Sequence, residues 1–274
     1  SILLMISLGL AIIYGTTGVI NMAHGEFVMI GAYTSWFLQT TFGMGLLVSI
    51  IPIFLITALM GFLIERIVIR HLYNRLLDTI LATWGIGVLL QQLIRLTVGS
   101  ELKYLKIPSF MAESMTLFGQ EVSIYRVFIF VFAILTFFIA WFIIYKTSFG
   151  IRLRAVTQNK DIASCFGINS GVVYSSTFAF GTGVAAVAGA FIAPLKSISP
   201  DMGTNYIIDA FMVVVLGGVG SLTGTAASSL IIGETSSFLA SFSNDTLAKA
   251  LVLLIIIIIL RIKPQGLFTK STRL

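Results

Sequence analysis

Residues 122–145 read VSIYRVFIFVFAILTFFIAWFIIY and contain one charged side chain, Arg126. A membrane-spanning helix needs about 20 mostly apolar residues, so this stretch is long enough to cross a bilayer. It is typical of the chain, in which 57% of the residues are hydrophobic and 10% are charged. Soluble domains carry about 25% charged residues. The sequence therefore predicts an all-α membrane protein and excludes a soluble one.

Other apolar runs of comparable length follow one another along the chain. They occupy residues 2–19, 25–39, 45–69, 79–98, 172–193, 207–239 and 247–260. The run 207–239 is too long for one span, and glycines interrupt it, so we expect either two short spans or a re-entrant hairpin there. Together the runs predict a bundle of about eight transmembrane helices, forming a single transmembrane domain over residues 1–274.

The basic residues predict how this bundle is oriented. Most of the 17 lysines and arginines fall in three segments, 65–78, 146–161 and 261–274, whereas the other connections mix basic with acidic residues. Cytoplasmic loops of membrane proteins are enriched in Lys and Arg. We therefore place these segments, and with them the C-terminus, in the cytoplasm. The net charge of +6 is assigned to this asymmetry and not to nucleic-acid binding.

Two interruptions of apolar sequence, one in each half of the chain, point to a transport pathway. The first is GVINMAHGE at residues 18–26, and the second is VVVLGGVGSLTG at residues 213–224. Discontinuous helices in corresponding positions of two halves are typical of transporter binding sites, and they predict an internal repeat. The second interruption lacks the Gly-Lys-Ser/Thr ending of a phosphate-binding loop, so we expect it to break and pack helices.

The polar side chains of the first interruption fall at membrane depth, where polar groups normally face a bundle interior or a water-filled cavity. Two interpretations stay open: these groups contact a substrate, or they hold the broken helix together by bonding its freed backbone groups. We also expect the two interruptions to approach each other in the fold. The candidate pathway residues from the two interruptions are Asn21, His24, Glu26, Gly217, Gly218 and Gly220.

A stripe of small residues recurs every four positions at Gly181, Ala185 and Gly189. Small residues on one helix face let backbones approach closely in lipid. The stripe predicts helix packing, and lining of a pore is the alternative.

A polar segment at residues 148–168, SFGIRLRAVTQNKDIASCFGI, separates two apolar runs. Its later half is expected to form a short helix that Thr157 or Asn159 caps and that Gly167 ends. We expect Ile162, Ala163 and Phe166 to share a face of this helix. A short amphipathic helix of this kind either lies on the membrane surface or docks in a groove of a partner.

Catalytic and metal-binding motifs are not evident in the sequence. The two histidines, His24 and His71, are not part of a His-Glu-x-x-His motif, and the single cysteine, Cys165, cannot form an intramolecular disulfide. We therefore expect a transporter rather than an enzyme, with no metal and no cofactor bound by this chain.

Four motifs, in order along nearly the whole chain, resemble those of the branched-chain amino acid type of ABC permease. They are NMAHGEFVMIGAY at 21–33, RLRAVTQNKDIASCFGI at 152–168, VLGGVGS at 215–221 and RIKPQGLF at 261–268. The resemblance implies a multi-pass permease subunit of the bacterial inner membrane. It also implies a second homologous permease subunit (a heterodimer), two cytoplasmic ATP-binding subunits that use the ATP, and a periplasmic substrate-binding protein.

By the same resemblance, residues 147–168 form a cytoplasmic coupling loop whose short helix sits in a groove of an ATPase. The coupling residues that the resemblance implies are Arg154, Thr157, Asn159, Asp161, Ala163, Phe166 and Gly167.

Within this family the sequence most resembles urea permeases, with branched-chain amino acid permeases as the alternative. Urea is neutral and needs only hydrogen-bonding groups, such as Asn21 and Tyr33. A zwitterionic amino acid would favour a cation or a positive helix terminus near its carboxylate, and no Lys or Arg stands in either interruption. We therefore expect ATP-driven urea import. A channel or secondary carrier for a small polar solute is the alternative from another class.

Overall fold

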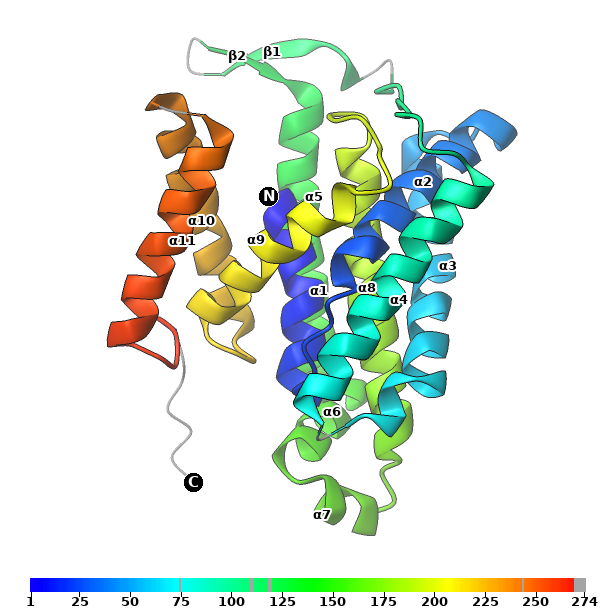
Figure 1. Ribbon diagram of the computed structural model, residues 1–274, viewed down its shortest axis with the longest axis vertical. Helices are drawn as coiled ribbons and strands as arrows, with labels where there is room; N and C mark the ends of the chain where they lie inside the picture. The colour runs from blue at the N-terminus through cyan, green and yellow to red at the C-terminus, as the bar shows by residue number, and fades with distance from the viewer. Residues whose placement is uncertain (74, 109–110, 118–119, 243, 269–274) are drawn as a thin grey trace.

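The computed structural model is a helical bundle with one small β-hairpin (Figure 1). It describes residues 1–73, 75–108, 111–117, 120–242 and 244–268, so Lys270 and Arg273 of the predicted basic tail lie outside the described residues. The elements are α1 (Ile2–Thr17), α2 (His24–Phe42), α3 (Leu46–Ile67), η1 (Ile69–His71), α4 (Leu76–Thr97), β1 (Ser114–Leu117), β2 (Gln120–Ser123), α5 (Ile124–Lys146), α6 (Ser148–Gln158), α7 (Lys160–Cys165), α8 (Ser170–Ile192), α9 (Met202–Gly217), α10 (Leu222–Phe242) and α11 (Asp245–Ile262).

Helix α8 is the centre of the bundle, and α1, α2 and α3 pack around it. Every residue of α8 from Gly181 to Ile192 is buried. A Cβ at Gly181 would meet the carbonyl oxygen of Gly9 on α1, and a Cβ at Gly189 would overlap the Val28 carbonyl oxygen on α2. Ala185, between them, is fully buried. The small residues of α8 therefore allow backbone-to-backbone contact on two sides of the helix.

Several helices of the described residues have the length and composition of membrane spans. Four are clearly long and apolar enough: α3 with η1, α4, α5 and α8. Helices α1 and α9 are shorter apolar helices of 16 residues each. The all-α membrane class therefore fits the structure, while the count of about eight spans and the internal repeat stay predictions.

The described residues of the three basic segments lie toward one end of the molecule. Figure 1 shows that α3, α5 and α11 all end toward the end that carries α6 and α7. The β1–β2 hairpin, which pairs Ser114 with Ser123, lies at the opposite end. This hairpin was not expected from the sequence; it occupies the polar residues directly before α5, which begins at Ile124 rather than Val122.

The glycine-rich interruption at 217–224 separates two antiparallel helices, as expected. Helix α9 ends at Gly217 and α10 begins at Leu222. Gly218 and Gly220 have positive φ angles of 91° and 80°, which L-residues with a Cβ rarely adopt. The turn therefore needs glycine at these two positions.

Candidate functional site

The first interruption runs backward along the helix that precedes it. Helix α1 ends at Thr17, yet His24 at the start of α2 donates from Nε2 to the carbonyl oxygen of Ile6, at 3.0 Å. Ile6 lies about 16 Å of helical rise before Thr17. Residues 18–23 therefore retrace much of α1, and Figure 1 shows α2 starting beside the middle of that helix.

Side chains satisfy much of the backbone of this returning segment. Thr83 on α4 accepts from the backbone N–H of Met22 at 3.1 Å, and its hydroxyl oxygen lies 3.4 Å from the Ile20 carbonyl oxygen. Asn21 Oδ1 accepts from the N–H of Ala23 at 3.1 Å. For Asn21 and His24, these contacts favour the interpretation in which polar groups hold the broken helix together. Asn21 Nδ2 and His24 Nδ1 are buried and have no partner among the described residues.

Glu26, in the first turn of α2, meets two other helices. It is 4% exposed, and its Oε1 accepts from Gln91 Nε2 on α4 at 2.9 Å. The same Gln91 nitrogen lies 3.4 Å from Thr204 Oγ1 on α9. The other carboxyl oxygen, Oε2, is buried without a hydrogen-bond partner in the described part of the chain. Polar groups at such depth are rare and typically functional.

The starts of α2 and α9 touch through two glycines. A Cβ at Gly25 would overlap the Gly203 carbonyl oxygen, and a Cβ at Gly203 would lie 2.8 Å from Glu26 Oε2. Helix starts carry unsatisfied N–H groups and a partial positive charge. Two such starts therefore converge beside the Glu26 carboxyl group.

An ion pair joins α4 to the start of α9 next to this carboxyl group. Arg95, one turn beyond Gln91 on α4, lies 2.5 Å from Asp201, which precedes α9. Tyr33, about two turns beyond Glu26 on α2, is 3% exposed, and its hydroxyl has no partner within the described ranges. No Lys or Arg stands near the first interruption in the sequence, but in the folded chain α4 brings Arg95 close to it from a distant segment.

These contacts define a group of residues that we call the α2–α4–α9 cluster. Its members are Glu26, Gln91, Arg95, Asp201 and Thr204. Of these, only Glu26 was among the candidate residues from the sequence. A sequence pattern was available for two further members, because Gln91 and Arg95 stand four residues apart on one face of an apolar helix.

The second interruption lies elsewhere on α1. Gly220 packs against Gly15, where a Cβ would lie 2.8 Å from the Gly220 Cα. Gly15 is about 14 Å of helical rise from Ile6, the residue that His24 contacts. The end of α1 at Gly15 therefore meets the second interruption, whereas His24 and Glu26 contact Ile6 and Gln91 instead. The closer approach of Asn21, His24 and Glu26 to residues 217–224 stays a prediction.

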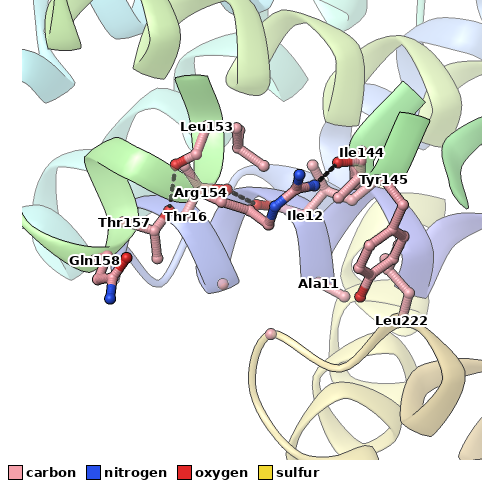
Figure 2. A pocket seen from close by; sticks show the side chains of 12 residues that line it. Ala11, Ile12, Thr16, Ile144, Tyr145, Leu153, Arg154, Thr157, Gln158 and Leu222 are labelled. Carbon is pink, nitrogen blue, oxygen red and sulfur yellow. Dashed lines mark hydrogen bonds between the residues drawn. The ribbon is translucent and has the colours of Figure 1, made fainter. Parts of the chain in front are cut away.

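A cavity of about 640 Å³ opens beside this second contact (Figure 2). Gly15, Thr16 and Gly220 line one side, and Arg154 and Thr157 of α6 line another. In Figure 2 the Arg154 guanidinium points to the Ile144 carbonyl oxygen at the end of α5, to which it donates. It also lies over the Tyr145 ring, 5.7 Å from the centroid. Arg154 therefore ties α6 to α5, next to the α9–α10 turn.

The predicted coupling loop contains two helices rather than one. Its first half forms α6, which buries Gly150, Leu153 and Val156 against the bundle. Its second half forms α7, capped by Asn159, whose Oδ1 accepts from the N–H groups of Asp161 and Ile162 at 3.0 Å each. The sequence missed α6 because its polar residues hide a buried apolar stripe.

Residues around α7 are sorted between an inner and an outer face. Thr157 does not cap α7; its hydroxyl donates to the Leu153 carbonyl within α6 at 2.9 Å. Gly167 ends the turn with a φ of 78°. Ala163 is 3% exposed and faces the bundle, whereas Ile162 and Phe166 are 57% and 82% exposed. All three nevertheless line one groove of about 600 Å³, as the expectation of a shared face requires. The other residues that line this groove are Ala155, Gln158, Asn159 and Ile168.

A second buried carboxyl group lies near this end of the molecule. Glu65 at the end of α3 is fully buried and accepts from Tyr73 at 2.5 Å and from the Ser175 hydroxyl on α8. Burial, and then the bond to Glu65, raise the pKa of Tyr73, so this residue stays protonated as a donor. These contacts fix the α3–α4 connection to the start of α8, directly after α7.

Comparison with known proteins places the chain in a family. Residues 1–260 match the family described as "Branched-chain amino acid transport system / permease component". The chain belongs to this permease family. It is a membrane-embedded permease subunit of the ABC transporter type, which agrees with the expectation of a transporter rather than an enzyme.

Several curated proteins are similar to this permease over nearly its whole length. The high-affinity branched-chain amino acid transport system permease protein BraD of Pseudomonas aeruginosa is 30% identical, covering 96% of this chain and 90% of BraD. LivH of Escherichia coli (strain K12) is 29% identical with the same coverage. The probable LivH of Methanocaldococcus jannaschii is 29% identical, over 97% of this chain and 88% of that protein. No solved structure matches the chain.

These comparisons agree with the expected family and change the expected substrate. The three relatives are named for branched-chain amino acids, and none of the three is named for urea. The sequence-based preference for urea therefore lacks support, and the alternative within the family matches the relatives better.

Proposed function

We propose that this permease is the membrane-spanning subunit of an ATP-driven importer of branched-chain amino acids. The observation that carries the proposal is the α2–α4–α9 cluster at the first helix interruption. It places a buried carboxyl group and a partly exposed arginine at neighbouring positions of the helical bundle. Intramembrane ionisable groups typically mark substrate pathways, and a neutral molecule such as urea does not require opposite charges.

The proposed partners follow from the family and from the exposed end of the molecule. Two ATP-binding subunits in the cytoplasm hydrolyse ATP and dock on α7, where the Phe166 ring and the adjacent groove are accessible. An exposed aromatic beside a groove is a typical anchor for a partner. A second homologous permease subunit completes the pathway, and a periplasmic binding protein delivers the substrate. The basic segments and the C-terminus then face the cytoplasm.

Uptake by cells with and without this chain tests the proposal. Cells would be given labelled leucine or labelled urea, with ATP depletion as a control in each case. We expect ATP-dependent leucine uptake to disappear with the chain and urea uptake to stay unchanged. Loss of urea uptake alone would contradict the proposed substrate, whereas uptake that survives ATP depletion would favour a channel or secondary carrier.

A further inference from the structure

One oxygen of the Glu26 carboxyl group has no hydrogen-bond partner among the described residues. Gln91 donates to Oε1, while Oε2 is buried and without a partner in the described residues, although the side chain is only 4% exposed. Leaving such a group unpaired costs free energy, so its retention is typical of functional sites. An ammonium group supplies donors for this oxygen.

Unlike this Glu26 oxygen, the guanidinium of Arg95 has a partner, and that partner can be exchanged. Arg95 is 30% exposed, but Asp201 is 68% exposed. An ion pair with one partner in solvent contributes little stability. Arginine also binds carboxylates in general through its planar fork. A carboxylate arriving beside α9 could therefore replace Asp201 on Arg95.

The two side chains stand close enough to act on one small molecule. Gln91 contacts Glu26 directly, and Arg95 follows Gln91 on the same face of α4, about 6 Å further along the helix axis. The starts of α2 and α9 meet beside them through Gly25 and Gly203. Their N–H groups and dipoles make this part of the bundle polar.

We propose that the α2–α4–α9 cluster binds the charged main-chain groups of an α-amino acid. Glu26 accepts from the ammonium group, and Arg95 donates to the carboxylate after releasing Asp201. The aliphatic side chain of the substrate contacts the apolar helix faces around the cluster. This inference rests on the proposed import of amino acids, and it assigns main-chain recognition within the membrane to these two residues.

A simpler role for the ion pair predicts a different outcome. If Arg95 and Asp201 only join α4 to α9, removal of either charge has the same effect on leucine binding. If Asp201 instead competes with the substrate, its removal strengthens binding while removal of Arg95 weakens it. Asp201→Asn and Arg95→Gln therefore separate the two roles by the sign of the change.

The experiment measures equilibrium binding of labelled L-leucine to the complete permease–ATPase assembly in lipid nanodiscs, without the binding protein. We expect Arg95→Gln and Glu26→Gln each to weaken binding at least about tenfold. Asp201→Asn should strengthen it about threefold, the size expected for removing an exposed competitor. Glu101→Gln and Arg75→Gln, exposed at 87% and 71% of their side chains, serve as matched controls.

Two leucine analogues show which charge each residue recognises. 4-Methylpentanoate lacks the ammonium group, and 3-methylbutylamine lacks the carboxylate. Wild-type protein should prefer leucine to both, Glu26→Gln should lose its preference over the acid, and Arg95→Gln should lose its preference over the amine. A purely structural role would weaken all three ligands together.

Several outcomes would overturn the inference. They are leucine binding within twofold of wild type in Glu26→Gln, unchanged or weaker binding in Asp201→Asn, and absence of leucine binding by the wild-type assembly. If cells still require the chain for leucine uptake, such a result removes the recognition site but leaves the proposed function standing. Failure of the uptake experiment would instead remove the proposed function.

Discussion

At the scale of single residues, the contact between α2 and α8 depends on a glycine. A Cβ at Gly31 would overlap the Ala186 carbonyl oxygen on α8. The position of this Cβ is fixed by the α2 backbone, and the oxygen belongs to the α8 backbone. The overlap can therefore be relieved only by shifting a helix. We expect Gly31→Ala to destabilise the protein by about 1–3 kcal/mol, seen as a lower melting temperature in detergent.

A second glycine on a helix provides the control for this prediction. A Cβ at Gly85 on α4 would have no heavy atom of a neighbouring element within 4 Å among the described residues. Gly85→Ala should therefore keep or slightly raise the melting temperature, because alanine favours helix more than glycine. Equal melting temperatures for the two variants would contradict the close approach of α2 and α8.

The residues of the candidate site were predictable only where they share a segment. Asn21, His24 and Glu26 stand together in a polar interruption of apolar sequence, so local pattern was enough to find them. Arg95 and Asp201 lie on different segments, and only the fold brings the last turns of α4 close to the start of α9. Contacts of this range leave no mark in a single sequence.

At the scale of elements, α7 presents one aromatic ring to solvent. Phe166→Ala should reduce recovery of the ATP-binding subunits with the purified permease at least about tenfold, because anchor residues dominate binding energy. Membrane insertion should be unchanged. Phe42→Ala serves as the control, since Phe42 is 65% exposed at the end of α2, away from α7. Normal recovery of the ATPases with Phe166→Ala would remove α7 as their docking element.

Elements were predictable where the residue types of a short segment determine its conformation, and less predictable where packing against other helices determines it. The turn between α9 and α10 was expected because Gly218 and Gly220 supply the positive φ angles that it needs. Helix α6 was not expected, because only Leu153 and Val156 bury an apolar stripe in a polar sequence. The β1–β2 hairpin was not expected because its strands have only four residues each, and the alternation of Ser, Met, Thr and Leu in β1 is too short to indicate a strand by itself.

At the scale of the whole molecule, Cys165 reports the proposed orientation. It is the only cysteine in the sequence and is exposed on α7. A membrane-impermeant maleimide should label it in inside-out vesicles that contain the permease without its ATPases, and should not label it in intact spheroplasts. Glu101→Cys in a Cys165→Ser background should show the reverse pattern. Labelling of Cys165 from outside would invert the proposed topology.

The returning segment 18–23 also has a consequence for how the protein enters the membrane. Helix α2 starts beside Ile6 in the middle of α1, and its start is held there by His24 and by Thr83 of α4. His24 finds its partner on α1 as soon as α2 has been made, whereas the backbone N–H of Met22 has no such partner until α4 has been synthesised. We therefore expect α1 and α2 to stay next to the translocon until α4 emerges, which would couple insertion of the first four helices during biogenesis.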